Sequence, residues 1–166
     1  MPNVVIETDH GTIEIALDEA KAPKTVENFL SYVDAKHYDG TIFHRVIKGF
    51  MAQGGGYDES YEKRPVRDPV QNEADNGLKN TRGTVAMART SDPHSATAQF
   101  FVNLVDNGFL DHSEKSASGW GYTVFGNVVR GMDVVDAIAK MPTGPAGPFQ
   151  KDAPATPVVI KSARRA

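Results

Sequence analysis

The stretch 41-TIFHRVIKGFMAQGGG-56 places one arginine, Arg45, among large apolar side chains. Its first seven residues are mostly β-branched or aromatic, which predicts a strand whose side chains alternate between two faces. The alternation assigns one face to Phe43, Arg45 and Ile47, and the other to Ile42, His44 and Val46. Arg45 is therefore expected to share its side of the strand with hydrophobic residues.

A second short strand is predicted after Gly49, because glycine adopts the backbone angles of a bend at little steric cost. The residues from Phe50 to Gln53 have the composition of this strand, which places Met51 and Gln53 on one face. The three glycines at 54–56 favour a bulge or the close approach of another backbone over a strand interior.

Arg45 needs hydrogen-bond acceptors if it is partly desolvated, because arginine cannot lose its proton and carries five N–H donors. A salt bridge or an ordinary surface position would satisfy that need. The neighbours favour a binding role instead, since Phe50 and Met51 can form a shallow apolar pocket and Gln53 adds a neutral donor and acceptor.

Four sequence blocks carry a resemblance to a known family. FHRVI at 43–47 and FMAQGG at 50–55 resemble the signature of the cyclophilin peptidyl-prolyl isomerases, and QFF at 99–101 and VFG at 124–126 match later blocks in the same order. The similarity extends over essentially the whole chain. It implies a mostly β fold, a closed eight-stranded antiparallel β-barrel capped by two α-helices, with an active groove on the outside of the barrel.

Three further blocks make the chain most similar to the bacterial cytoplasmic type of this family. They are NEA at 72–74, GLKNTRG at 77–83 and HSATAQFF at 94–101.

Composition limits the class of protein. The 166 residues suit one domain, 1–166, and the absence of cysteine excludes disulfides and thiolate metal sites. The five histidines show no paired metal spacing, so we expect neither metal nor cofactor. A net charge of −3 argues against nucleic-acid binding through a broad basic field.

The sequence also predicts a soluble, cytoplasmic protein. No apolar run approaches the roughly 20 residues of a transmembrane helix, and the N-terminus lacks the basic segment and apolar run of a secretory signal. The family resemblance makes a monomer the default expectation.

Hydrophobic periodicity predicts two helices, from Pro23 to about Lys36 and from Met132 to about Lys140. The other predicted strands are 4–8 and 12–17, which form a hairpin, then 84–89, 98–104, 120–125 with 127–129, and 158–160. The segments 57–80 and 142–157 are interpreted as ordered surface connections. From the residues alone a sandwich and a barrel remain open, and the resemblance favours the barrel.

Five large apolar residues come from three predicted segments: Phe50, Met51, Phe101, Phe109 and Leu110. In an arbitrary protein they would belong to the core. The resemblance implies instead that they line a pocket for a substrate proline ring, with Arg45 projecting over the ring. It further implies Ala88 and Tyr122 at the pocket edge, and Gln53, Arg89 and Gln99 along the groove. His44 is interpreted as a groove-side or core histidine that supports Arg45.

The reaction that suits these residues is rotation about an X-Pro peptide bond, in proline-containing peptides and in unfolded or folding protein chains. A guanidinium that donates to the prolyl nitrogen at the twisted geometry would stabilise that state more than either planar amide. The rival hypothesis is a proline-peptide binding module or a holding chaperone without significant catalysis.

Three residues depart from the family pattern. Phe109 stands where the drug-sensitive cyclophilins carry tryptophan, and Tyr122 stands where they carry histidine. The missing indole N–H predicts that cyclosporin binds at most weakly. Arg89 replaces the more usual asparagine, which matters little if that residue contacts substrate through its backbone.

Overall fold

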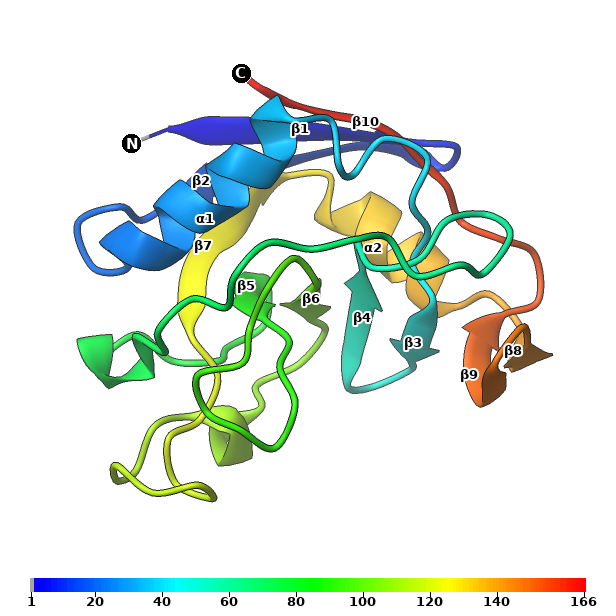
Figure 1. Ribbon diagram of the computed structural model, residues 1–166. Helices are drawn as coiled ribbons and strands as arrows, with labels where there is room; N and C mark the ends of the chain where they lie inside the picture. Colours follow the sequence, from blue (N-terminus) through cyan, green and yellow to red (C-terminus); the bar gives the residue numbers. More distant parts are fainter. Residues whose placement is uncertain (1) are drawn as a thin grey trace.

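An eight-stranded antiparallel sheet forms the body of this computed structural model, which describes residues 2–166 (Figure 1). The strand order across the sheet is β10-β1-β2-β7-β5-β6-β4-β3. The strands are β1 Asn3–Thr8, β2 Gly11–Leu17, β3 Arg45–Ile47, β4 Met51–Gly54, β5 Thr84–Met87, β6 Phe100–Asn103, β7 Val124–Arg130 and β10 Ile160–Arg165. A separate two-stranded sheet consists of β8 Thr143–Ala146 and β9 Phe149–Pro154.

The sheet curls but stays open, so the expectation of a closed barrel is wrong. Its two edge strands, β10 and β3, are not hydrogen-bonded neighbours. Toward β10, the segment before β3 makes an isolated bridge, Ile42 to Val159, with two flanking bonds, Phe43 N–H to Val158 O at 3.0 Å and Ile160 N–H to Thr41 O at 2.7 Å. No ladder forms there because the same short segment also bonds to Tyr57, so its hydrogen bonds are divided between two neighbours.

Two α-helices and two short 3₁₀ turns complete the fold: α1 Pro23–Asp34, α2 Met132–Ala139, η1 Ala74–Asn76 and η2 Gly108–Leu110. Both helices begin where the sequence predicts, and α1 ends two residues early. Lys36 has a φ of +59°, a left-handed conformation that cannot continue a right-handed helix.

A large cluster of buried side chains, here called the main core, lies between the helices and one face of the sheet. Each helix directs its apolar face into this core, where Val26 and Phe29 of α1 and Val135 and Ile138 of α2 are buried. Aromatic rings fill its centre, with Phe29 against Tyr38, Phe100 and Phe125 at 5.0–5.7 Å between centroids.

The predicted face assignment of Phe43 is wrong. Phe43 is buried in the main core together with Val46, whereas Arg45 is exposed. The regular ladder begins only at Arg45, so the strand alternation does not extend back to Phe43.

A second, smaller group of side chains, here called the outer cluster, lies on the opposite face of the sheet. Along β6, Phe100 and Val102 enter the main core and Phe101 enters the outer cluster, as the alternation of side chains along a strand requires. Its buried members are Met51, Ala86, Phe101, Leu110 and Val124, and Ile47, Phe50, Leu78, Ala88 and Tyr122 pack against them.

Some predicted strand limits differ from the structure. The strand predicted at 120–125 begins only at Val124 and continues to Arg130, and the closing strand is Ile160–Arg165 rather than 158–160. The segment 142–157 is not only a connection, because it contains the β8–β9 hairpin. The N- and C-terminal strands β1 and β10 lie side by side (Figure 1). Within residues 2–166, no helix is both long and apolar enough to cross a lipid bilayer.

Candidate active site

One cross-strand row connects the predicted site residues. Arg45 of β3 pairs with Gln53 of β4, Gln53 pairs with Phe101 of β6, and Phe101 pairs with Ala86 of β5. Ala86 in turn pairs with Val124 of β7. Directly paired residues of an antiparallel sheet point to the same face, so Arg45 stands on the face that carries the outer cluster.

The guanidinium of Arg45 is available to a ligand. Its side chain is exposed, and none of the carboxylates among residues 2–166 lies within 4 Å of it. Within residues 2–166 its side chain makes one hydrogen bond, a long one from Nη1 to Gln53 Oε1 at 3.5 Å. Most of its N–H donors are therefore directed to solvent or to a bound molecule.

Gln53 and Gln99 extend this polar line. Gln53 Nε2 donates to Gln99 Oε1 at 2.8 Å. The Gln99 side chain lies directly over Gly56, where a Cβ atom would overlap it. Gly54 similarly leaves room for the backbone, because its Cβ would lie 2.9 Å from Ile42 O, which confirms the predicted close approach.

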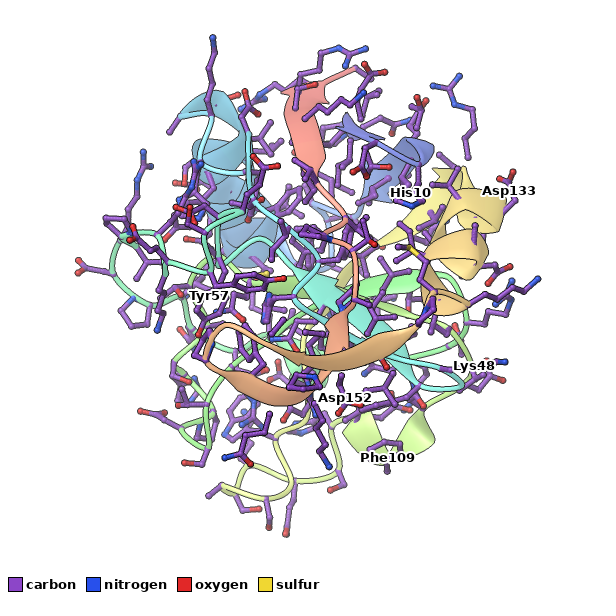
Figure 2. The ribbon with its side chains drawn as sticks, turned by 90° about the vertical axis from the view of Figure 1, so that its right-hand side faces the viewer. His10, Lys48, Tyr57, Phe109, Asp133 and Asp152 are labelled. Atoms are coloured by element: carbon purple, nitrogen blue, oxygen red, sulfur yellow. The ribbon has the colours of Figure 1, made fainter. Side chains whose placement is uncertain are left out.

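The apolar side of the site, here called the notch, consists of Phe50, Met51, Phe101, Phe109 and Leu110. Met51, Phe101 and Leu110 are buried, whereas Phe50 is half-buried and Phe109 is 75% exposed. Phe109 stands on the η2 turn (Figure 2) and stacks on Phe50 with 5.7 Å between ring centroids. These five residues are thus neither all core nor all surface: three form a floor, and two aromatic rings form a rim.

Tyr122 and Arg89 close another edge of the notch. The Tyr122 ring meets Phe101 edge-on at 5.8 Å, and the Arg89 guanidinium lies 4.4 Å from the Tyr122 centroid. Arg89 Nε donates to Gly121 O at 3.1 Å and Nη1 donates to Thr90 O at 2.8 Å. The Arg89 side chain therefore holds Tyr122 by a cation–π contact. From the sequence, Arg89 is notable only because the family usually has asparagine at this position, so this role was not predicted.

A pocket of about 230 Å³ continues from this edge. Four expected groove residues line it, namely Gln53, Ala88, Arg89 and Gln99. Sequence reasoning missed its other lining residues, Lys63, Val66, Thr90, Ser95 and Thr97, because they lie in loops without periodicity.

His44 lies away from the notch, as a core histidine and not a groove-side one. It is 3% exposed, stacks on Phe149 of β9 at 5.2 Å, and contacts Tyr57 at 4.7 Å between ring centroids. Burial, with a smaller contribution from the charge of Arg45, lowers the pKa of His44 to about 4. Its ring is therefore neutral at pH 7 and cannot act as an acid there.

Among residues 2–166, no three His, Asp or Glu side chains come close enough together to hold a metal ion. The site presents the cations Arg45 and Arg89, the neutral amides of Gln53 and Gln99, and apolar rings.

Comparison with known proteins gives consistent matches over nearly the full chain. The family model described as cyclophilin type peptidyl-prolyl cis-trans isomerase/CLD matches residues 3–165. The chain is 58% identical to peptidyl-prolyl cis-trans isomerase cyp18 of Streptomyces antibioticus, covering 99% of this chain and 98% of the relative. It is 56% identical to peptidyl-prolyl cis-trans isomerase B of Escherichia coli (strain K12), covering 96% of each.

A solved structure has the same fold. The cyclophilin type peptidyl-prolyl cis-trans isomerase of Cryptosporidium parvum, crystallised in the presence of the dipeptide Ala-Pro, superposes with a TM-score of 0.78 at 25% identity. The match covers 99% of this chain and 98% of the solved one.

Proposed function

The chain belongs to the cyclophilin family and is a peptidyl-prolyl cis-trans isomerase, and we propose that Arg45 accelerates the rotation while the outer cluster holds the proline ring. The substrates are proline-containing peptides and unfolded or folding protein chains. The isomerase thereby assists protein folding.

Amide resonance sets the barrier that the enzyme must lower. Partial double-bond character makes rotation about X-Pro cost roughly 18–20 kcal/mol, which limits the uncatalysed process to tens of seconds or more. At the twisted geometry the prolyl nitrogen loses conjugation and gains a lone pair that can accept a hydrogen bond. No covalent bond needs to break.

Arg45 would stabilise this twisted state selectively. A guanidinium N–H directed at the prolyl nitrogen finds a good acceptor only when the amide is twisted, so it lowers the barrier without tightening the ground state. An acceleration of about 10⁵ corresponds to about 7 kcal/mol, which this donor shares with fixation of the ring and exclusion of bulk water. Gln53, beside Arg45, would hold the carbonyl side of the bond.

The observation that carries this proposal is the cross-strand row. It joins Arg45, whose guanidinium has no carboxylate partner in the described chain, to Phe101 at the floor of the notch through a single intervening residue, Gln53. A family member from Cryptosporidium parvum was crystallised in the presence of the dipeptide Ala-Pro, and this supports proline-containing peptides as ligands of the proposed site.

The decisive experiment compares the isomerisation rate of a proline tetrapeptide with wild type, Arg45→Ala and Arg45→Lys. We expect Arg45→Ala to lower kcat at least about 100-fold, the usual effect of removing one transition-state donor. Arg45→Lys should recover little, because a point charge lacks the planar fork. Melting temperatures should stay close to wild type, since Arg45 is exposed.

The rival reading, a binding module or holding chaperone, predicts a different result. A wild-type protein that binds the peptide without accelerating it would support that reading. Equal rates for wild type and Arg45→Ala would refute the assignment of Arg45 while leaving the family intact.

The proposal also includes one catalytic domain over 1–166, a monomer in the cytoplasm, and activity without metal or cofactor. Sedimentation at working concentration tests the monomer, and cell fractionation tests the compartment. Full activity after dialysis against a chelator is the expected result for a reaction that needs only side chains of the chain itself.

A further inference from the structure

Three asparagine side chains form a hydrogen-bonded chain behind the notch. Asn80, Asn103 and Asn107 are 1%, 0% and 3% exposed. Asn107 Nδ2 donates to Asn103 Oδ1 at 2.9 Å, and Asn103 Nδ2 donates to Asn80 Oδ1 at 3.1 Å. The three amides, here called the amide chain, therefore run in one donor-to-acceptor direction.

The two ends of the amide chain contact the backbone of the residues that form the notch. At one end, Asn107 Nδ2 also donates to Phe50 O at 3.0 Å. At the other end, Asn80 Nδ2 lies 3.3 Å from Leu110 O and 3.4 Å from Tyr122 O. The amide chain thus spans from the Phe50 side of the notch to the side formed by Leu110 and Tyr122.

Further hydrogen bonds fix the amide chain in place. Asp111 Oδ1 accepts from Asn80 N–H at 2.7 Å and from Asn80 Nδ2 at 3.1 Å, a charge-assisted pair. Asn103 Nδ2 also donates to Thr84 Oγ1 at 2.9 Å, and Asn107 N–H donates to Asn80 O at 2.8 Å. Because these bonds hold all three side chains, the network specifies one geometry.

The η2 turn depends on this network for its position. It is only three residues long, and its Phe109 is 75% exposed. The turn begins after Asn107, whose carbonyl accepts from Leu110 N–H at 2.9 Å, and Tyr122 N–H donates to Leu110 O at 2.9 Å. Leu110 is the one buried side chain of these three residues, so the backbone bonds share with it in fixing the position of the turn.

Apolar residues could fill the same space without the cost of burying amides, since buried polar networks give little net stability compared with well-packed apolar groups. What amides provide and apolar groups do not is direction, because each bond fixes where a carbonyl lies. The carbonyls fixed here belong to Phe50, Leu110 and Tyr122, which carry the walls of the notch.

We propose that Asn80, Asn103 and Asn107 are positioning residues that set the width of the proline-ring notch, and hence the affinity for the ring, while Arg45 sets the rate of rotation. This inference rests on the function proposed above. It assigns binding and rotation to two groups of residues that separate variants can distinguish.

The test is the pair Asn107→Ala and Asn107→Ser, with Tyr38→Phe as the matched control. Tyr38→Phe removes one buried hydrogen bond of the main core, Oη to Ala98 O at 2.7 Å, and leaves the notch untouched. For each protein we would measure the melting temperature, the dissociation constant of an Ala-Pro peptide by NMR titration, and kcat and KM by NMR exchange.

We expect Asn107→Ala to raise both the peptide dissociation constant and KM about tenfold, with kcat changed less than about twofold. Asn107→Ser retains a donor and should recover part of the affinity. Tyr38→Phe should lower the melting temperature to a comparable extent with peptide affinity unchanged. If Asn107→Ala does not fold, the inference is tested by comparing the peptide affinity and melting temperature of Asn107→Ser with those of Tyr38→Phe.

Two outcomes would overturn the inference. The first is an Asn107 variant that loses stability but binds the peptide as wild type does, because the amides would then be structural only. The second is additivity between Asn80→Ala and Asn107→Ala in peptide affinity, because members of one connected network should be strongly non-additive. A wild-type protein that neither binds nor isomerises proline peptides would instead refute the proposed function itself.

Discussion

Two adjacent residues, His44 and Arg45, show how finely the chain separates structural from catalytic chemistry. Arg45 is exposed and has a guanidinium without a carboxylate partner among residues 2–166. His44 is 3% exposed, and its Nδ1 has no hydrogen-bond partner within the described chain. A neutral buried ring behind Arg45 adds no competing charge to the site.

The burial of His44 should make the protein sensitive to acid. The folded pKa, about 4, lies below the ordinary value of 6.5, so as the pH falls the unfolded chain binds a proton first. The stability contributed by neutral His44 is complete above about pH 6.5 and is lost between 6.5 and 4. The loss should reach about 1.4 kcal/mol per pH unit and about 3 kcal/mol in total.

Denaturant unfolding of wild type and His44→Phe at a series of pH values between 4 and 7 measures this effect. Phe retains an aromatic ring against Phe149 and Tyr57 but does not titrate. The variant should show a shallower pH slope, and some slope should remain because burial also lowers the pKa of His37. Identical slopes in both proteins would show that His44 is not the acid-sensitive group.

Strand β6 illustrates, at the scale of one element, how the same four residues serve stability and function. Phe100 is fully buried and meets Phe29, Tyr38 and Phe43 at 5.5–6.1 Å in the main core. Phe101, the next residue, forms the floor of the notch. Strand alternation therefore separates the two roles by one position.

Leucine substitutions on β6 should separate these roles. Phe100→Leu should lower the free energy of unfolding by about 1–2 kcal/mol, through lost contacts and a small cavity, with kcat/KM within about twofold of wild type. Phe101→Leu should weaken proline-peptide binding more than it lowers stability. Chemical unfolding and isomerase assays on both variants measure this, and a reversed ranking would contradict the assignment of the two faces.

The η2 turn determines the expected response to cyclosporin. Phe109 cannot donate a hydrogen bond, and its exposed ring offers only a stacking surface beside Phe50. Wild type should be inhibited weakly, and Phe109→Trp should increase the inhibitor affinity about tenfold by restoring an N–H donor. Titration of the drug against activity tests both statements. Nanomolar inhibition of wild type would show that tight cyclosporin binding does not require an indole N–H at position 109.

Elements with clear periodicity were predictable from sequence, and elements stabilised by long-range contacts were not. The helix faces and the alternation along β6 follow from local patterns. The β8–β9 hairpin was missed because its strands carry Pro145 and Pro154, yet Pro145 falls at the irregularity in the register and Pro154 is the last residue of β9. Phe43 was misassigned because its backbone N–H donates to Val158 O, more than 100 residues away, before the regular β3 ladder begins.

The same distinction holds for the site. Arg45, Gln53 and the apolar rings lie in motifs that the sequence displays, so their grouping could be predicted. The amide chain could not, because Asn80, Asn103 and Asn107 come from a loop, a strand end and a turn with no shared pattern. An asparagine at the end of an apolar strand, such as Asn103, was the only local signal.

At the scale of the whole molecule, the curled open sheet gives the protein two apolar groups with different tasks. The main core lies on the face covered by the helices, and the outer cluster lies on the other, where it remains accessible. A closed barrel would also place the main core and the outer cluster on opposite faces of the sheet, because strand alternation separates them whether or not the sheet closes. The open edges between β10 and β3 therefore change the architecture without moving the site.

Charge is also divided unevenly over the molecule, and this predicts a substrate preference. The net charge is −3, yet the pocket beside the notch is lined by Lys63 and Arg89 and by no carboxylate. Neither cation forms a salt bridge within residues 2–166. A peptide meets this local positive field at short range, where the distant negative charges of the surface are screened.

We expect peptides with Glu at one of the two positions before proline to show a kcat/KM about two- to fivefold higher than those with Lys, the range of partly exposed ion pairs. The difference should shrink as salt is raised from about 0.01 to 1 M, because the screening length falls from about 30 to about 3 Å. Lys63→Glu should abolish or invert the preference. Lys161→Glu, on the exposed surface of β10, changes the net charge equally and should leave the preference intact. If both variants shift the preference by the same factor, net charge and not the pocket is responsible, and the local argument fails.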